Sequence, residues 1–539
     1  MTDAMPPEEM ARRNFLKLCG LVALPGFLAA CQTEISGQGS VTPGPSPTVK
    51  PSATKTPTLT NADWSALAKR MKGPLILPGS AQYATARQLF DPRFDGVKPA
   101  AIAYCATPTD VQVCLAFAHR FNVAVTARSG GHSYAGYSTT TGLVLDVTHM
   151  NTVALNSNKA SATVGAGAKL IDVYTALASH GLVVPAGSCP TVGVAGLTQG
   201  GGVGVIGRKF GLTCDNLLSA QVVTADGRVL TCDSKQNPDL FWALRGGGGG
   251  NFGVVTSFTF QTHQVPTLSL FTLQWSWGSA ADVVNAWQSW APQAPDEVWS
   301  NCLLLAPANK NASPLVQVNG VYVGGLAPLN SLLLQLTKRI GAAPSSRFVW
   351  TDSILNTMLY EAGCYNKTVA ECHLPTQNPQ GQYQRSVGGA KSDYFTKALP
   401  RPAINVLVNA ISKRHASTTL GEGGISLDAS GGAINRVAAN ATAFVHRNDL
   451  FSAQYNASWN VSDARSIVDA NHAWLNATWQ AMRPYASGAA YQNYIDPDLK
   501  NWQQAYYGSN FSRLQQVKAT YDPHNFFHFA QSIPPATGA

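Results

Sequence analysis

The chain has 539 residues, of which 45% are hydrophobic and 12% are charged, and its formal net charge is +9. This length exceeds one ordinary hydrophobic core, so the composition predicts a globular protein of at least two domains. No long run of lysine or arginine occurs, so the charge indicates a weakly basic surface and argues against nucleic-acid binding.

The first 31 residues predict export and lipid anchoring. Arg12 and Arg13 open a twin-arginine pattern, and the apolar run over 18–30 is too short to span a bilayer. Residues 28–31 resemble a bacterial lipobox in which Cys31 becomes the lipidated first residue. The alternative is a simple signal peptide with a chance cysteine. We expect export by the twin-arginine route, which carries folded proteins, and anchoring at the cell envelope or surface.

Residues 32–61 predict a linker. They are rich in Pro, Ser, Thr and Gly and contain no aromatic residue. Such a segment cannot bury enough apolar surface to fold, so we expect an extended tether. Folded sequence is expected from about Trp64.

The cysteines that follow the predicted signal peptide and linker show no CxxC spacing, so they do not indicate a zinc site. Cys364, Cys372 and His373 are the nearest approach to a metal cluster, but a disulfide or buried free thiols are favoured in a compartment that permits disulfides. We therefore predict no bound metal.

The first half of the folded chain predicts short strands alternating irregularly with helices. One helix is expected over 113–121, capped by Thr109 and Asp110, and another over 170–180. Asp226 and Gly227 predict a hairpin turn. The expected strands are 101–105, 123–126, 143–146, 162–167, 217–224 and 229–231. This is an α+β pattern, not a regular βα repeat.

The amino-acid composition changes near Pro266, and the sequence that follows is rich in tryptophan. Trp275 and Trp277 are expected to alternate on a strand, and Trp287 and Trp290 to lie on a helix. Aromatic faces could form a sugar platform, but core packing is favoured. We predict a first domain over 62–265, a second domain over 266–485, and a C-terminal segment, 486–539, that returns to the first domain.

Two glycine-rich loops each carry one nucleophilic side chain. His132 lies in the loop 128–134, and Cys189 lies in the loop 187–193, which continues to a glycine run at 200–202. Glycines let backbone approach a ligand closely, and successive N–H groups in turns form anion-binding nests. The pair predicts a flavin held by two covalent bonds.

Residues 202–207 also satisfy GxGxxG, with Asp226 at the spacing of a ribose-binding acid. A dinucleotide fold requires a strand immediately before these glycines. Residues 197–201 do not form a strand pattern, so we do not expect a Rossmann site.

Four stretches of the chain resemble berberine bridge enzyme-like flavoproteins of the vanillyl-alcohol oxidase superfamily: 128–133, 189–204, 239–253 and 522–535. The resemblance covers about 63–265 and 488–535 well and the middle of the chain more weakly. It implies an α+β fold with a two-part FAD-binding domain, made by the N-terminal region and a C-terminal return. An inserted α+β substrate domain would be built on an antiparallel sheet.

The resemblance implies that His132 bonds to the flavin 8α-methyl carbon and Cys189 to ring carbon C6. Imidazole and thiol are nucleophiles in their unprotonated forms near neutral pH. Residues 246–250 resemble the family's segment near the adenine. The other expected cofactor-binding residues are Arg128, Ser129, Gly130, Gly131, Ser133, Val192, Gly193, Gly200, Gly201, Asn251, Gly253 and Asn525.

Tyr491 to Tyr494 resemble the Tyr-x-Asn-Tyr motif from which sugar- and polyketide-oxidising members draw their base. We expect Tyr494 to be the base, with Tyr491 assisting. Two core aromatics on one strand are the alternative, but a spacing of three would place them on opposite faces. A tyrosine with a pKa near 10 is a poor base, so its environment must stabilise the phenolate or share the proton.

Gln454 matches a substrate-facing position where alkaloid-cyclising members carry a glutamate base, and Tyr134 matches a pocket tyrosine. Glutamine cannot usefully take a proton, so chemistry of the alkaloid-cyclising kind is not expected. Val192 falls where valine resembles the oxygen-using members and leucine the dehydrogenases.

The expected function is oxidation of an alcohol to a carbonyl or lactone, with FAD reoxidised by O2 to give H2O2. The alcohol would be the reducing end of an oligosaccharide or a secondary-metabolite hydroxyl. One alternative is a dehydrogenase that passes electrons to a quinone or protein acceptor. Another is a surface lipoprotein that binds a ligand without turnover.

Overall fold

The computed structural model describes residues 57–157 and 159–537. The predicted signal peptide, Cys31 and residues 32–56 of the predicted linker lie outside this part of the chain. Helix α2 (Asn61–Arg70) begins after Thr60, whose hydroxyl accepts the N–H of Asp63. Folded sequence therefore starts a few residues before Trp64, and the linker ends by Thr60. None of the helices in the described ranges is both long and apolar enough to cross a bilayer.

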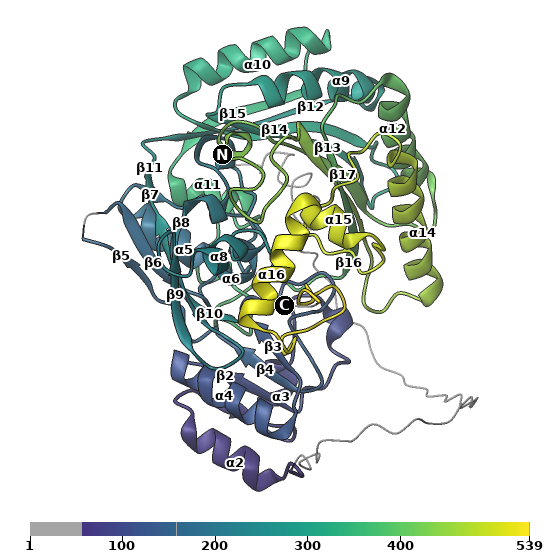
Figure 1. Ribbon diagram of the computed structural model, residues 1–539. Helices are drawn as coiled ribbons and strands as arrows, with labels where there is room; N and C mark the ends of the chain where they lie inside the picture. The colour runs from purple at the N-terminus through teal and green to yellow at the C-terminus, as the bar shows by residue number, and fades with distance from the viewer. Residues whose placement is uncertain (1–56, 158, 538–539) are drawn as a thin grey trace.

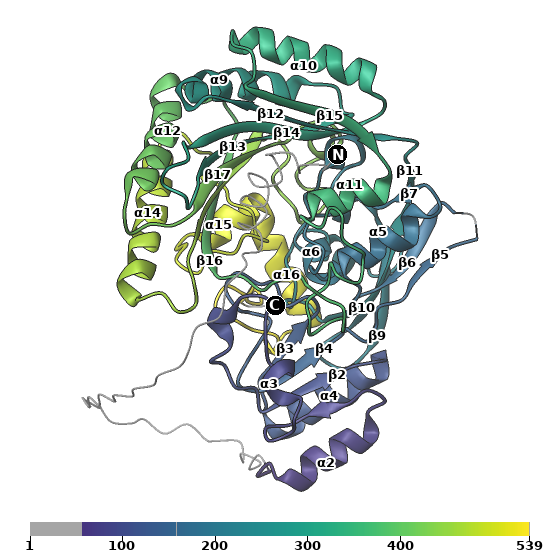
Figure 2. The same cartoon turned by 180° about the vertical axis from the view of Figure 1, so that it is seen from behind.

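The N-terminal region begins with a mixed four-stranded sheet in the order β1-β2-β4-β3. Strands β2 and β3 both run parallel to β4, and a crossover helix joins β2 to β3 (Figure 2). The elements are β1 (Leu75–Ile76), β2 (Ala101–Tyr104), β3 (Val125–Arg128), β4 (Leu143–Asp146), α3 (Tyr83–Ala86) and α4 (Pro108–Phe121).

Helix α4 starts at Pro108, five residues before the predicted range 113–121. Thr107 forms a capping box with Asp110, and Pro108 occupies the first helical turn. The predicted cap at Thr109 was wrong because proline is favoured just inside a helix start, which makes the preceding threonine the cap.

A second sheet is antiparallel, in the order β5-β6-β10-β8-β9. The predicted hairpin between β8 and β9 is confirmed, with Gly227 at a φ of 80° in its turn. The strands are β5 (Val153–Leu155), β6 (Ser161–Gly165), β8 (Leu217–Val223), β9 (Val229–Asp233) and β10 (Val254–Gln261). Two further strands, β7 (Leu182–Val183) and β11 (His263–Gln264), pair in a separate two-stranded sheet. The helices of this region are α5 (Leu170–Ala178), α6 (Val194–Gln199), α7 (Gly207–Phe210) and α8 (Pro238–Ala243).

The GxGxxG match lies between α6 and α7, with no strand leading into it. The prediction that it is not a Rossmann site is confirmed, because a helix and not a strand precedes these described residues, and the helix that opens at Gly207 has only four residues.

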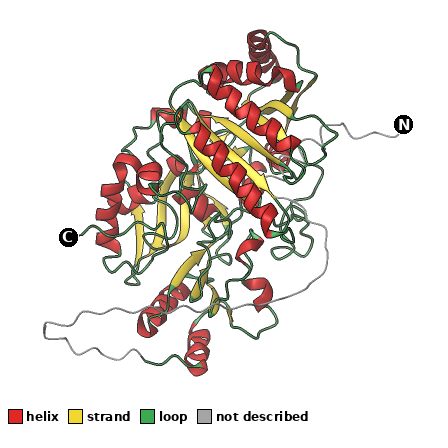
Figure 3. Ribbon diagram, turned by 90° about the vertical axis from the view of Figure 1, so that its right-hand side faces the viewer, coloured by secondary structure: helices red, strands yellow, loops and turns green. Residues whose placement is uncertain are grey.

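The middle region is a seven-stranded antiparallel sheet in the order β15-β12-β14-β13-β17-β18-β16. Helices α9, α10, α12 and α14 lie on its outer face (Figures 1 and 3). The elements are β12 (Leu268–Trp275), β13 (Val298–Ala306), β14 (Leu315–Val323), β15 (Ser346–Asp352), β16 (Gly388–Phe395), β17 (Gly423–Ala429), β18 (Phe451–Ser458), α9 (Ala280–Trp290), α10 (Leu326–Ile340), α11 (Ile354–Glu361), α12 (Arg401–Ala416), α13 (Ala433–Arg436) and α14 (Arg465–Met482).

The tryptophans of this region pack in its core. Trp275, Trp287 and Trp290 are buried in the cluster between the sheet and the outer helices, which confirms core packing over a sugar platform. Trp277 does not lie on the strand as predicted. It begins a short 3-10 turn that leads directly into α9, so β12 ends at Trp275.

The C-terminal segment returns to the N-terminal region, where α16 packs beside α8 (Figure 1). The Lys518 ammonium, buried in the interface, donates to the carbonyls of Asn251 and Phe527 at 2.6 Å each. The elements are α15 (Trp502–Tyr507) and α16 (Phe511–Tyr521). The mixed and antiparallel sheets and this return confirm the predicted α+β fold.

Candidate active site

A cavity of about 320 Å³ lies where the N-terminal region, the inner face of the seven-stranded sheet and the C-terminal segment meet. It brings together His132 and Cys189, which lie in separate loops, with Gln454 on β18 and with Tyr491 and Tyr494 near the C-terminus. The fold therefore gathers the predicted nucleophiles and the predicted catalytic side chains around one space.

All but three of the predicted site residues line this cavity. Those that do are Tyr134, Gln454, Tyr491, Tyr494, His132, Cys189, Arg128, Ser129, Gly130, Gly131, Ser133, Val192, Gly193, Asn251 and Gly253. Those that do not are Gly200, Gly201 and Asn525.

The three exceptions serve the packing around the cavity. A Cβ on Gly200 would lie 1.9 Å from the side-chain oxygen of Asn493, and one on Gly201 would lie 2.7 Å from the ring of Phe444. These glycines thus admit neighbouring segments of the chain. Asn525 occupies a turn with a φ of 50°, a conformation that asparagine tolerates better than most residues.

The two glycine-rich loops are pressed together. A Cβ on Gly130 would lie 2.1 Å from the amide nitrogen of Gly193, and a Cβ on Gly193 would lie 2.1 Å from the hydroxyl of Ser129. Neither position can carry a side chain without moving backbone. Close contact between these loops is what brings His132 and Cys189 to the same cavity.

His132 is held by side chains from two other segments. Its ring stacks on Phe90 with centroids 4.0 Å apart, and its Nε2 lies 2.9 Å from the hydroxyl of Thr191. Burial, together with the nearby Lys169 cation, lowers the pKa of His132 to about 3. The imidazole is therefore neutral at physiological pH, which is the nucleophilic form.

Lys169 and Arg128 stabilise the start of the His132 loop through a hydrogen bond and an ion pair. The Lys169 ammonium donates to the carbonyl of Ser129 at 3.2 Å, and burial lowers the pKa of Lys169 to about 8. The Arg128 guanidinium pairs with Asp146 at 2.5 Å across β3 and β4. Arg128 thus fixes the end of the strand that delivers the loop.

The Tyr-x-Asn-Tyr segment is irregular and not a strand, so both tyrosines face the same cavity. Their rings meet edge to face at 4.9 Å, and Tyr134 stacks on Tyr494 at 5.7 Å with an interplanar angle of 9°. Three aromatic rings thus form one wall. The alternative, that Tyr491 and Tyr494 are core aromatics on one strand, is therefore wrong.

The Tyr491 hydroxyl accepts three hydrogen bonds. The donors are the N–H groups of Gly202 at 2.9 Å and Val203 at 3.3 Å, and the side-chain amide of Asn493 at 2.8 Å. These donors favour the phenolate, but burial outweighs them and raises the pKa of Tyr491 to about 12. Tyr491 is therefore protonated at neutral pH in the absence of a further charge.

Gln454 reaches the cavity because β18 alternates its side chains. Ala453 and Tyr455 on either side pack toward the outer helices, so Gln454 points inward. Its side-chain amide donates to the Tyr134 hydroxyl at 3.2 Å. This bond links the sheet to the His132 loop.

The cavity also presents polar atoms suited to a ligand. The side-chain carbonyl oxygens of Gln199 and Gln531 are buried and have no hydrogen-bond partner among the described residues, and both residues line the cavity. Such atoms are costly unless a ligand or water donates to them. With the glycine cradle and the two nucleophiles, they fit FAD, whose ring and ribose carry N–H and O–H donors.

Sequence reasoning did not single out several lining residues, among them Phe90, Gln199, Gln492, Tyr506 and Tyr507. Gln531 lies in a stretch that carried the family resemblance, so its motif could have indicated it. Phe90 and the Tyr506–Tyr507 pair have no local signal, because only tertiary contacts bring them to the cavity.

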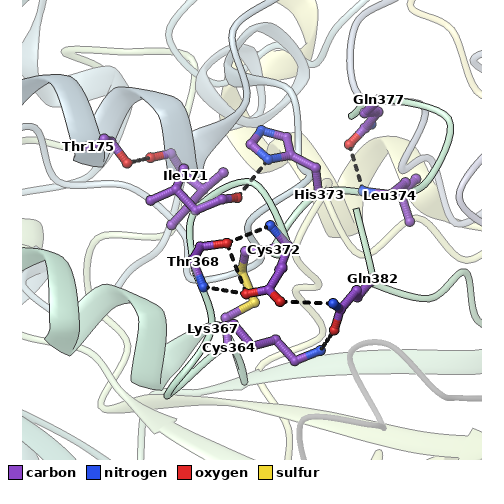
Figure 4. Close-up of a disulfide and its surroundings, with 12 residues drawn as sticks. Ile171, Thr175, Cys364, Lys367, Thr368, Cys372, His373, Leu374, Gln377 and Gln382 are labelled. Carbon is purple, nitrogen blue, oxygen red and sulfur yellow. Dashed lines mark hydrogen bonds between the residues drawn. A yellow bond between two sulfur atoms is a disulfide. The ribbon is translucent and has the colours of Figure 1, made fainter. Parts of the chain in front are cut away.

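The disulfide between Cys364 and Cys372 lies next to helix α5, whose first turn contacts the Cys189 loop. Cys364 is bonded to Cys372, as Figure 4 shows, and the next residue, His373, reaches toward the helix that carries Ile171. The His373 ring lies 3.0 Å from a carboxylate oxygen of Asp172. At the start of the same helix, the N–H of Ile171 donates to the carbonyl of Pro190 at 3.2 Å. The two cysteines that most resembled a metal cluster are thus used in a structural bond.

Replacing both Cys364 and Cys372 with serine is expected to lower the free energy of unfolding by about 2.5 kcal/mol, because the bond closes a short loop in the unfolded chain. Urea denaturation monitored by tryptophan fluorescence measures this change. Reducing agent should destabilise the wild-type protein by a similar amount and leave the double variant unaffected. An equal response of both proteins to reducing agent would contradict the prediction.

Two family models match the chain. The "FAD binding domain" model matches residues 99–233, and the "Berberine and berberine like" model matches residues 490–534. These two matched segments contribute the His132 and Cys189 loops and the two tyrosines.

Curated relatives cover most of the chain. An uncharacterised FAD-linked oxidoreductase of Bacillus subtilis, YgaK, is 34% identical over 81% of this chain and 91% of its own length. Berberine bridge enzyme-like 12 of Arabidopsis thaliana is 33% identical over 81% of this chain and 85% of its own.

Solved structures share the fold. A chitooligosaccharide oxidase matches with a TM-score of 0.78 and 29% identity, covering 88% of this chain and 100% of that one. The grass pollen allergen Phl p 4, which has glucose dehydrogenase activity, matches with a TM-score of 0.78 and 27% identity over 88% of this chain and 99% of its own.

Proposed function

This chain belongs to the berberine bridge enzyme-like family of FAD-linked oxidoreductases, and on that premise we propose that it is an alcohol oxidase with a doubly attached flavin. The FAD would be bonded through His132 and Cys189. The substrate alcohol would be oxidised to a carbonyl or lactone while O2 is reduced to H2O2. The observation that carries this proposal is the convergence of His132, Cys189, Tyr491 and Tyr494 on one cavity.

The attachment proposal is supported by the state of the two nucleophiles. The low pKa of His132 keeps its imidazole unprotonated, and Cys189 is partly exposed to the cavity rather than packed in a core. The glycine cradle of Gly130 and Gly193 would let backbone N–H groups approach the pyrophosphate.

The proton chemistry is assigned to the tyrosine wall. When bound, FAD supplies the acceptor for the hydride that leaves the alcohol carbon. Tyr494 takes the proton from the alcohol hydroxyl, and Tyr491, whose hydroxyl is held by three donors, assists it. Gln454 and Tyr134, joined by their hydrogen bond, orient the substrate. The products balance as one carbonyl compound and one H2O2 for each alcohol and O2.

The choice of O2 as acceptor rests on Val192, which lines the cavity on the Cys189 loop. A dehydrogenase that uses a quinone or protein acceptor is the second candidate, favoured by the glucose dehydrogenase activity of Phl p 4. Val192→Leu is expected to slow reoxidation of the reduced flavin by O2 by about tenfold or more without changing the rate of flavin reduction. Stopped-flow reoxidation by air and by quinones separates the two candidates, and faster reoxidation by quinones in the wild type would favour the dehydrogenase.

The experiment for the function as a whole is a panel of sugars and phenolic alcohols. Flavin bleaching without O2 reports reduction of the flavin by the alcohol, and peroxide release in air reports the acceptor. The proposal requires at least one alcohol that does both. If no alcohol bleaches the flavin while ligands still bind, a non-catalytic surface lipoprotein becomes the better account.

Export and anchoring complete the proposal. Twin-arginine transport carries folded proteins, which suits a chain that must load FAD in the cytoplasm, and Cys31 would then hold the enzyme at the cell envelope by a lipid. We take 62–265 with 486–539 as the FAD-binding domain and 266–485 as the substrate-binding domain. Cys31→Ser should move the protein from the membrane fraction to the soluble fraction. Retention of this variant in the membrane fraction would remove the lipid anchor from the proposal.

A further inference from the structure

Thr191 connects the loop that carries Cys189 to the imidazole of His132. It is the second residue after Cys189, and its side chain is buried. Its hydroxyl lies 2.9 Å from Nε2 of His132. One of the two predicted nucleophiles is therefore held by a side chain of the loop that carries the other.

The main chain around Thr191 is fixed independently of its hydroxyl. The N–H of Leu170 donates to the carbonyl of Val192 at 3.0 Å, and the N–H of Ile171 donates to the carbonyl of Pro190 at 3.2 Å. These bonds come from the first two residues of α5 and hold the residues on either side of Thr191. Loss of the Thr191 hydroxyl should therefore leave this loop, with its cysteine, in place.

Stacking on Phe90 does not by itself fix the orientation of the His132 ring. The two ring centroids lie 4.0 Å apart with an interplanar angle of 18°, and a half-turn of the imidazole about its Cβ–Cγ bond would preserve this contact. The same half-turn would move Nε2 away from the Thr191 hydroxyl. The hydrogen bond to Thr191 thus selects one of the two orientations that stacking permits.

The same contact determines which nitrogen of His132 carries the proton. A neutral imidazole has one N–H and one lone pair, and the partner of one nitrogen sets the state of the other. Burial is the largest effect on the pKa of His132 and lowers it to about 3, and a hydrogen bond to the Thr191 main chain opposes this by favouring the protonated ring. We assign the N–H to Nε2, on the Thr191 side, so that the lone pair lies on Nδ1.

We infer that Thr191 is a positioning residue for flavin attachment at His132, so that the Cys189 loop controls bond formation in the other loop. The inference rests on the covalent flavin of the proposed function and concerns how one of its two bonds is made. Thr191 holds the ring in one orientation and the proton on Nε2, which presents the lone pair of Nδ1 for the bond to the flavin 8α-methyl carbon.

A hydroxyl suits this position before and after attachment. In net terms, bond formation removes one hydrogen from the imidazole and one from the 8α-methyl group, and O2, the acceptor in the proposed function, takes both as H2O2. Nε2 then has a lone pair in place of its hydrogen. The Thr191 hydroxyl can accept from the N–H and afterwards donate to the lone pair, so the contact is kept throughout.

The test compares the full-length chain with Thr191→Val, which keeps the shape of the side chain but lacks the hydroxyl. Samples taken during expression are precipitated with acid and digested, and peptide masses give the fraction of His132 and of Cys189 that carries flavin. Thr191→Val should slow attachment at His132 about tenfold, the effect of one hydrogen bond, while attachment at Cys189 stays within about twofold of the wild-type rate.

Two further substitutions at the same position and one control separate positioning from folding. Thr191→Ser keeps the hydroxyl and should attach flavin at both sites as the wild type does. Thr191→Ala lacks the hydroxyl and should match Thr191→Val. Thr198→Val, on α6, removes a buried hydroxyl that donates to the carbonyl of Val194 at 2.7 Å, and it should leave both attachments unchanged.

Thr191→Val in the Cys189→Ala background gives a second readout. Cys189→Ala alone should keep its flavin in the acid pellet through the bond to His132. The double variant has only the slowed attachment at His132, so samples taken early in expression should release most of their flavin into the supernatant. Absorbance of the supernatant measures this difference.

The outcomes distinguish this inference from the proposed function. If the wild type carries no flavin at His132, the attachment in the proposed function fails and the inference fails with it. If the wild type carries flavin at both sites and Thr191→Val attaches it at His132 equally fast, only the inference fails. Equal slowing at both sites, or the same slowing in Thr198→Val, would indicate a general disturbance of the fold and would also overturn the inference.

Discussion

Replacing His132 and Cys189 together with alanine is expected to give a protein that releases all of its flavin when it is precipitated with acid. Wild-type protein should keep its yellow colour in the pellet, because two covalent bonds survive unfolding. Cys189→Ala and His132→Ala should each retain one attachment and therefore remain yellow. Absorbance of the supernatant and the masses of flavin-bearing peptides measure the outcome.

The control for this experiment is Cys232→Ala, which removes a free thiol buried away from the cavity. It should leave both attachments intact. Flavin lost from wild-type protein on acid precipitation would refute covalent attachment. Flavin retained by the double variant would show that another side chain forms a bond.

Replacing Tyr494 with phenylalanine is expected to slow flavin reduction by about 10² to 10⁴-fold, the range that positioned general bases contribute. The flavin should stay attached, since Tyr494 lies in a different segment from both nucleophiles. Rapid mixing of anaerobic enzyme with substrate measures the reduction rate directly. An unchanged rate would remove Tyr494 from the role of base.

Tyr491→Phe and Tyr134→Phe complete this test. Loss of the Tyr491 hydroxyl leaves the N–H groups of Gly202 and Val203 without their acceptor, so its variant should lose both rate and thermal stability. Tyr134→Phe removes the acceptor of the bond from Gln454 and should change KM more than kcat. A larger loss in Tyr134→Phe than in Tyr494→Phe would move the base to Tyr134.

Much of the site could be predicted because its chemistry is carried by short contiguous segments. His132, Cys189 and the Tyr491 to Tyr494 segment each lie in a local pattern of glycines or aromatics, and these patterns keep their meaning without knowledge of distant contacts. The same holds for the β8 to β9 hairpin, whose Asp226 and Gly227 determine the turn.

Other predictions failed where a local pattern has more than one solution. The stretch around Pro108 offers two threonines as helix caps, and the position of the proline decides for Thr107. Trp277 continues an alternating pattern, but the chain turns into α9 at that point. A local proline determines the first boundary, and the start of the next helix determines the second.

The sequence by itself determined the family, the two nucleophiles, the tyrosine motif and the expected cofactor, since each depends on residue type at fixed spacing. Tertiary structure decided which glycines face the cavity: Gly130 and Gly193 do, whereas Gly200 and Gly201 make room for Asn493 and Phe444. A glycine has the same backbone freedom in both settings, so only the approach of distant segments distinguishes them.

The environment of the nucleophile was likewise decided by tertiary contacts. Phe90 and Lys169 lie far from His132 in the sequence, and burial beside them sets its low pKa. The seven-stranded sheet also depends on pairing between strands that are far apart in the sequence, such as β13 and β17, where Asn301 lies opposite Asp428, 127 residues away. Strand register cannot be obtained from alternation alone, because each strand is compatible with several partners until packing selects one.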